Sequence, residues 1–161
     1  MKLYKLIEGI DLLNIKGSLD LEIEGIAYDS RFVFQNYLFV CINGNTTDGH
    51  YYIYEAISRG ATAIIVEKNI MVNSATIIHV ENSRDVLPII SSRFYNNPTD
   101  MLKLIGITGT NGKTTTTYLV KSILESWNKK VGLLGTIAIE IGNKKIESLR
   151  TTPESLDLQM L

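Results

Sequence analysis

"GITGTNGKTTTT", Gly106 to Thr117, decides how the second half of this sequence folds. The stretch ends an apolar run, "MLKLIGIT", and is followed by Leu119, Ile123 and Trp127 at helical spacing. This order consists of a strand, a glycine-containing turn, a Lys-Thr pair and a helix. In it, backbone N–H groups and the helix dipole point toward an anion bound at the helix N-terminus. The sequence therefore predicts a phosphate-binding loop at this point.

Each residue type in the loop has a chemical reason. Glycines let the backbone approach phosphates without a Cβ atom in the way. Lys113 is expected to reach the β- and γ-phosphates, and the Thr114 hydroxyl is expected to ligate Mg²⁺. These two residues are the predicted catalytic pair, and Thr114 is the predicted metal ligand. The predicted nucleotide-binding set is Gly109, Thr110, Asn111, Gly112, Lys113, Thr114 and Thr115.

The glycines of this loop depart from the general phosphate-loop pattern G-x-x-x-x-G-K-[ST]. That pattern places its first glycine at position 107, where this sequence has Ile107, with Gly106 and Gly109 on either side. The alternative reading is a helix start that happens to read Gly-Lys-Thr. The apolar run before the loop and the amphipathic stretch after it favour the phosphate site.

Composition bounds the class of protein. The chain has 161 residues, of which 45% are hydrophobic and 20% charged, with a net charge of −1, which is typical of a globular chain. This balance gives no electrostatic reason to expect nucleic acid or an anionic membrane as a partner. No signal peptide or membrane-length apolar run is visible, so we expect a cytoplasmic location. Cys41, the single cysteine, is expected to be buried.

Residues 1–98 alternate short strands and helices, which is typical of a small α/β domain. A helix is expected between Asp48 as N-cap and Gly60 as stop signal, and another from Asn82 or Ser83, in which Pro88 fits only within the first turns. The four expected strands lie in "EIEGIAYDS", "NYLFVCI", "ATAIIVE" and "ATIIHVE".

A second domain is expected over residues 99–161, after the linker "NNPTD". "MLKLIGIT" and "KVGLLGT" read as buried strands of a parallel sheet, and "IAIEIGNKKIESL" as a hairpin that turns at Gly142-Asn143. A helix is expected after Pro153. The predicted fold class is therefore α/β, with a small N-terminal domain followed by the start of a phosphate-loop, parallel-sheet domain.

The displaced glycine and the string "GTNGKTT" resemble the Mur ligase family, the ATP-dependent amide ligases of peptidoglycan precursor synthesis. "YDSR" (Tyr28 to Arg31), "LFVCINGNTTDGHYYIYEAISRGATAIIVE" and "TTP" (Thr151 to Pro153) are similar to its MurE type. The family's remaining central domain and its C-terminal domain have no counterpart here. The resemblance therefore implies an N-terminal portion of a ligase, with an ATPase part that is incomplete and inactive by itself.

The resemblance implies a UDP-binding domain over residues 1–98 and a reaction that uses ATP and Mg²⁺. The whole enzyme is expected to be a cytoplasmic monomer that adds an amino acid to UDP-MurNAc-L-Ala-D-Glu through an acyl phosphate. Whether the amino acid is meso-diaminopimelate or L-lysine stays open. His50 and His79 are expected to be structural. The substrate-binding residues implied by the family are Tyr28, Ser30, Asn45, Thr46, Thr47, Thr151 and Thr152.

Two other functions remain to be weighed against this one. A MurF-like ligase shares the features of the first domain, but the "TTP" segment argues against it. A non-catalytic module that binds a UDP-sugar nucleotide is the second alternative, in which the loop is vestigial. The intact Lys113 and Thr114 argue against a vestigial loop.

Overall fold

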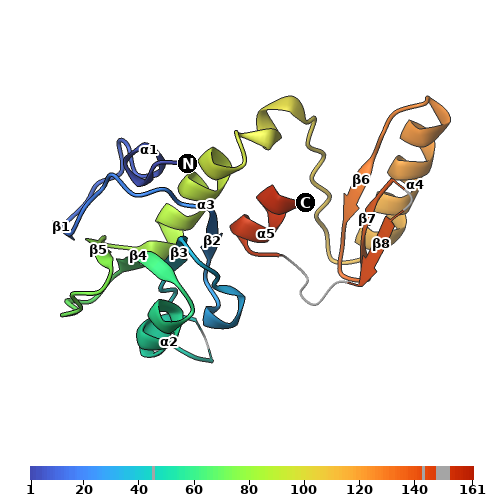
Figure 1. Ribbon diagram of the computed structural model, residues 1–161. Coiled ribbons are helices and arrows are strands. Elements are labelled where there is room, and N and C mark those ends of the chain that lie inside the picture. Colours follow the sequence, from blue (N-terminus) through green and yellow to red (C-terminus); the bar gives the residue numbers. More distant parts are fainter. Residues whose placement is uncertain (45, 143, 148–152) are drawn as a thin grey trace. The chain divides into compact units, whose positions relative to one another are not determined.

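The computed structural model describes residues 1–44, 46–142, 144–147 and 153–161 (Figure 1). The chain divides into two compact units, Met1–Asp100 together with Ser155–Leu161, and Met101–Glu154. Within the described ranges, every helix is too short or too polar to cross a bilayer. The division into domains at residue 98 stays a prediction.

The first unit is built on a five-stranded sheet whose order is β1-β5-β4-β3-β2. Strands β2 to β5 pair in parallel, and β1 runs antiparallel along the outer edge of β5. The four predicted strands of this half are confirmed, whereas β1, three exposed residues long, has no apolar pattern that could reveal it. The strands are β1 (Asn14–Lys16), β2 (Gly25–Ala27), β3 (Tyr37–Val40), β4 (Ala61–Val66) and β5 (Thr76–His79).

Helices cover both faces of this sheet because successive strand residues point to opposite sides. Ile65 of β4 packs in the cluster that contains Leu87 of α3, while its neighbour Ile64 packs in the cluster with Ile53 of α2. Each buried aliphatic side chain of this size contributes about 1.5–3 kcal/mol. The helices of the unit are α1 (Leu3–Leu6), η1 (Ser30–Phe32), η2 (Gly49–Tyr52), α2 (Ile53–Ser58), α3 (Ser83–Phe94) and α5 (Ser155–Met160), and η3 (Pro98–Met101) spans its boundary with the second unit.

Most predicted helix boundaries are confirmed by their local geometry. The Asn82 side chain accepts a hydrogen bond from the Arg84 N–H at the start of α3. Gly60 ends α2 with a φ of +114°, and a Cβ there would lie 2.7 Å from the Cα of Gln35, so glycine is required.

The expectation for Pro88 is confirmed. Helix α3 begins at Ser83, so Pro88 is its sixth residue and lies in the second turn. Pro88 cannot donate the usual helical hydrogen bond to the residue four positions before it. The residue is exposed, so water can take the place of that donor on the solvent side. The buried face, with Leu87 and Ile90, continues the helix through the proline.

A buried polar network holds the entry to α2. The Glu67 N–H donates to Nε2 of His50 at 3.0 Å, so the ring proton lies on Nδ1 and is shared with Asp48 at 2.5 Å. Lys68 also donates to Asp48. Burial raises the pKa of Asp48, but the hydrogen bonds from Lys68 and His50 outweigh it and hold that pKa well below its usual range. His79 donates to the Glu67 carbonyl at 3.0 Å, which fits the structural role expected for both histidines.

Asp48→Asn is expected to lower the free energy of unfolding by about 2 kcal/mol at pH 7. The pKa of Asp48 is depressed in the folded state, so its contribution is complete above the unfolded pKa of about 4 and is lost as the pH falls below it. Urea unfolding of both proteins between pH 7 and pH 3.5 measures this change, with the exposed Asp11→Asn as control. A difference that stays constant down to pH 3.5 would contradict the assignment.

Burial has made Cys41 unreactive, as the sequence indicates. Its side chain has no exposed surface, and burial raises the pKa of the thiol. The thiol lies among the apolar side chains on the α2 face of the sheet.

The second unit contains α4 (Lys113–Ser126) and a three-stranded antiparallel sheet, β6-β7-β8. The predicted helix and the predicted hairpin are confirmed, the latter as β7 (Ala138–Ile141) and β8 (Lys144–Glu147) around Gly142. The expectation of a buried parallel strand in "KVGLLGT" is wrong. Strand β6 (Gly132–Leu134) pairs antiparallel with β7, and only its central residue, Leu133, is buried.

The expected strand in "MLKLIGIT" is wrong. Residues 102–109 form neither helix nor strand, and Leu102, Leu104 and Ile105 are exposed. A strand needs a neighbour for its backbone N–H and C=O groups, and no described residue of this unit pairs with the segment. The apolar residues make burial of the segment favourable. It becomes a strand only where another strand pairs with its backbone.

Glu140 joins the helix and the sheet of the second unit. Its carboxylate accepts hydrogen bonds from Lys121 and, at 3.1 Å, from the Tyr118 hydroxyl of α4. The Lys145 ammonium lies 3.3 Å away on β8. The hydrogen bond from Lys121 lowers the pKa of Glu140, so the charged carboxylate is stabilised by its neighbouring lysines.

Candidate nucleotide and substrate sites

The phosphate loop has the backbone that its glycines predict. Gly109 has a φ of +150° and Gly112 a φ of +76°, values that side-chain-bearing residues rarely adopt. Helix α4 starts directly after Gly112, and its first turn carries no acidic residue. The first N–H groups of a helix have no intrahelical acceptor, so they and the helix dipole favour a bound anion at this end.

Lys113 lies over the loop with its ammonium near the backbone. Its Nζ donates to the Gly109 carbonyl at 2.6 Å and lies 3.5 Å from the carbonyl of Thr110. The side chains of Thr114 and Thr115 are exposed next to it. A cavity of about 180 Å³ opens here, bordered by Ile107, Lys113, Thr114, Thr117, Tyr118 and residues 133–138. The loop thus offers one cation, two hydroxyls and a helix N-terminus to a phosphate chain.

The residues present fit a phosphate better than they fit a bare metal ion. Across the described ranges, no three His, Cys, Asp or Glu side chains gather where they could hold a cation. Glu140 is occupied by Lys121. Thr114 stays a prediction as a Mg²⁺ ligand, and its single hydroxyl would require nucleotide phosphates and water to complete such a site.

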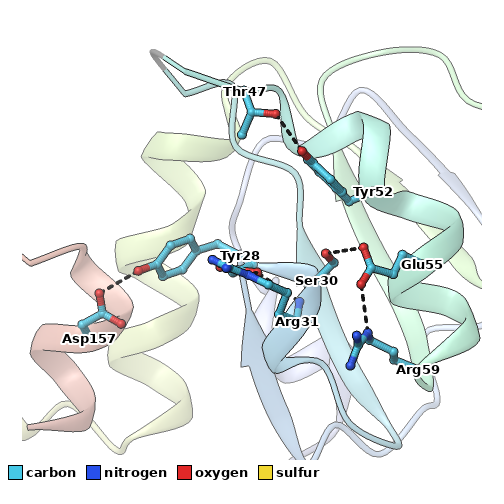
Figure 2. A network of polar contacts seen from close by, with 9 residues as sticks. Tyr28, Ser30, Arg31, Thr47, Tyr52, Glu55, Arg59 and Asp157 are labelled. Carbon is cyan, nitrogen blue, oxygen red and sulfur yellow. Dashed lines mark hydrogen bonds and ion pairs between the residues drawn. The ribbon is translucent and has the colours of Figure 1, made fainter. Parts of the chain in front are cut away.

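The predicted substrate residues of the first unit follow two neighbouring parallel strands. Tyr28 comes directly after β2, and the loop around Thr47 follows β3. Because β2 and β3 run in parallel, their carboxyl ends meet at one edge of the sheet. Ligands of α/β sheets bind at this edge, and Figure 2 shows that both segments contribute side chains there.

The structure gives Tyr28 and Ser30 definite partners. The Tyr28 hydroxyl donates to Oδ2 of Asp157 at 2.8 Å, and the Ser30 hydroxyl donates to Oε2 of Glu55 at 2.9 Å (Figure 2). Tyr28 is half-buried, whereas Ser30 is 5% exposed. The second Glu55 oxygen accepts from Nε of Arg59 at 3.0 Å.

The loop before α2 is only partly described. Thr46 is exposed, and the hydroxyl of Thr47 lies 3.1 Å from that of Tyr52 (Figure 2). The predicted substrate residues Asn45, Thr151 and Thr152 lie outside the described residues.

Sequence reasoning missed three polar residues of this edge: Glu55, Arg59 and Asp157. The spacing of Glu55 and Arg59, four positions apart on a helix, is a visible signal for an ion pair. Nothing in the sequence links Asp157 to Tyr28, because 129 positions separate them. Only the packing of α5 against the first unit brings the two residues together.

Two family models match the chain. The model of the Mur ligase family catalytic domain matches residues 22–95, and the model of the Mur ligase middle domain matches residues 107–161. The chain belongs to the Mur ligase family. The first match contains the sheet edge with Tyr28 and Ser30, and the second contains the phosphate loop.

Curated relatives of this Mur ligase chain carry one activity in their names. A UDP-N-acetylmuramoyl-L-alanyl-D-glutamate–2,6-diaminopimelate ligase of Alkaliphilus oremlandii is 56% identical over 161 residues, all of this chain and 33% of the relative. A similarly named ligase 1 of Clostridium acetobutylicum is 52% identical over 162 residues, again all of the chain and 34% of the relative. The chain spans about a third of the length of these curated relatives.

Solved structures agree on the fold. A structure of a UDP-N-acetylmuramoyl-L-alanyl-D-glutamate–2,6-diaminopimelate ligase matches 99% of the chain and 32% of its own length, with a TM-score of 0.75 and 23% identity. The MurF ligase of Thermotoga maritima in complex with ADP matches 65% of the chain and 23% of its own length, with a TM-score of 0.50 and 36% identity.

Gly112→Ala is expected to weaken ATP binding by about tenfold, because an alanine at a φ of +76° is strained and the loop must move to relieve it. Gly106→Ala is the matched control. A Cβ meets no atom within 4 Å at either position, but only Gly112 has a positive φ. Titration of both variants with ATP measures the effect, and equal losses in the two would refute the role of the left-handed backbone.

Proposed function

We propose that this chain is part of an ATP-dependent ligase of the MurE type, which adds the third amino acid to UDP-MurNAc-L-Ala-D-Glu. The observation that carries the proposal is the phosphate loop, with Lys113 and Thr114 at the start of a helix whose first turn has no acid. The relatives named as ligases of this substrate support it at 56% and 52% identity.

In this proposal, a substrate carboxylate takes the γ-phosphoryl group of ATP to form an acyl phosphate and release ADP. The incoming amine then attacks the acyl carbon, which forms the amide and releases phosphate. Lys113 exchanges its contact with the Gly109 carbonyl for the β- and γ-phosphates. The first backbone N–H groups of α4 bind phosphate oxygens, and the Thr114 hydroxyl would ligate a Mg²⁺ ion that neutralises phosphate charge. Catalysis by these residues consists of positioning and charge neutralisation.

The first unit is proposed to bind the UDP end of the substrate. Tyr28, Ser30 and the loop around Thr47 gather at the carboxyl edge of a parallel sheet, where such folds bind ligands. Asn45, Thr151 and Thr152 complete the proposed substrate set on the resemblance alone. The relatives' printed names favour 2,6-diaminopimelate as the added amino acid.

The second candidate is a MurF-type ligase, which the solved MurF structure in complex with ADP favours through its 36% identity. The two candidates differ in the acceptor that they elongate. The whole protein, assayed with UDP-MurNAc-dipeptide and with UDP-MurNAc-tripeptide, tells them apart. Turnover of the tripeptide alone would replace the MurE reading by the MurF reading.

Lys113→Ala in the whole protein is expected to lower kcat by at least about a hundredfold, because no other cation of the loop can reach the transferred phosphoryl group. Phosphate release with UDP-MurNAc-dipeptide and 2,6-diaminopimelate measures this loss. Lys129→Ala, an exposed lysine beyond the end of α4, is the control.

Unchanged turnover in Lys113→Ala would leave a module that binds the UDP-sugar nucleotide without using this loop for catalysis. Equal losses in Lys113→Ala and Lys129→Ala would point to a general electrostatic effect of removing a lysine.

A further inference from the structure

The two hydroxyl groups assigned to the nucleotide end of the substrate both point their protons at carboxylates. Tyr28 donates to Asp157 at 2.8 Å, and Ser30 donates to Glu55 at 2.9 Å (Figure 2). Neither carboxylate is among the substrate-binding residues predicted from the sequence. They come from α5 and α2, two elements that lie far apart in the sequence.

This arrangement decides what the hydroxyls can offer to a ligand. A hydroxyl has one proton and accepts through its lone pairs, and an ionised carboxylate accepts only. While each proton is shared with a carboxylate, the oxygen atoms of Tyr28 and Ser30 act toward a ligand as hydrogen-bond acceptors. They therefore suit N–H and O–H groups and do not suit groups that only accept.

Both carboxylates are themselves held in place. Glu55 is fixed through its other oxygen by Arg59, one turn further along α2. Asp157 lies next to Leu156, which is 7% exposed and packs in the core cluster with Leu87 of α3. Groups held in this way keep their direction before a ligand arrives, which lowers the ordering that binding requires.

A uridine diphosphate has hydrogen-bond donors in its nucleoside and only acceptors in its diphosphate. Its uracil imide N–H and ribose hydroxyls are donors, whereas the oxygens of its diphosphate only accept. The negative charge of Asp157 also opposes a diphosphate at this point, whereas that of Glu55 is paired with Arg59. The pair of hydroxyls is matched to the nucleoside and mismatched to the phosphates.

We propose that Asp157 and Glu55 are positioning residues that set Tyr28 and Ser30 as hydrogen-bond acceptors for donor groups of the nucleoside. The proposal rests on the proposed function, since it requires a UDP-linked substrate in the first unit. It goes further by naming which part of the nucleotide these hydroxyls recognise and which two carboxylates make that recognition possible.

The test measures binding of UDP and of inorganic pyrophosphate to the 161-residue chain by calorimetry. Every protein carries Lys113→Ala, which removes the loop cation as a competing phosphate contact. Tyr28→Phe and Ser30→Ala are each expected to weaken UDP about tenfold and to change pyrophosphate binding less than about twofold. Tyr4→Phe, which removes an exposed phenol hydroxyl of α1, is the matched control.

The same variants identify the donor. A loss confined to UDP and absent with CDP, which has no imide N–H, assigns the contact to the base. A loss absent with 2′-deoxy-UDP assigns it to the ribose hydroxyl. Either result supports the proposal, and losses of equal size for UDP and pyrophosphate would overturn it.

The role of Asp157 is separated from a purely structural one by three variants. Asp157→Ala is expected to weaken UDP about tenfold, and Asp157→Asn to recover most of that loss, because the amide oxygen still accepts the phenol proton. The double variant Tyr28→Phe/Asp157→Ala is expected to bind no worse than Tyr28→Phe alone. Asp11→Asn controls for the loss of a negative charge, and Leu156→Ala for weaker packing of α5.

Glu55→Ala is expected to act on Ser30 in the same way, with Glu8→Gln as its exposed control. Additive losses in the double variant, or a loss in Leu156→Ala as large as that in Asp157→Ala, would overturn the positioning role. UDP binding with no response to any of these variants would overturn the inference and leave the proposed function intact. A chain that binds no UDP at all would overturn both.

Discussion

Parallel pairing of β2 with β3 is the constraint on which the substrate side of this protein depends. Parallel strands end at the same edge, so whatever follows each strand is brought to one place. Tyr28 and Ser30 follow β2, and the loop around Thr47 follows β3. The pairing in turn depends on helices that cover both faces, because every strand residue from Leu38 to Val40 is buried.

Polar groups beside that sheet hold other residues of the site in place. Asp48 and His50 hold the start of η2, directly after the loop that carries Thr47. Glu55 and Asp157 direct the hydroxyls of Ser30 and Tyr28. Asp48 is buried and requires its hydrogen-bond partners, whereas Glu55 and Asp157 are half-buried. The orientation of the site therefore follows from the partners that the fold gives to each carboxylate.

The phosphate loop depends on local chemistry to a much greater extent. Its turn needs residues with positive φ, its helix needs a start, and both lie within a few residues of Lys113. For this reason the loop forms as predicted even though the apolar segment before it, residues 102–109, does not become a strand. The backbone hydrogen bonds of a turn are made within its own few residues, whereas those of a strand require a neighbouring strand.

The sequence by itself determined the α/β class, four of the five strands of the first sheet, the main helices and the turn that leads into α4. These features come from alternation, capping and glycine geometry, which act over a few residues. Tertiary structure alone decided that β1 joins the sheet, that β6 pairs antiparallel with β7 and that residues 102–109 pair with no strand among the described residues. It also decided the partners of the hydroxyls. The spacing of Glu55 and Arg59, four positions apart, is a weak local signal for their ion pair. Asp157 and Tyr28 are 129 positions apart, and no local pattern predicts a contact that depends on the packing of α5 against α3.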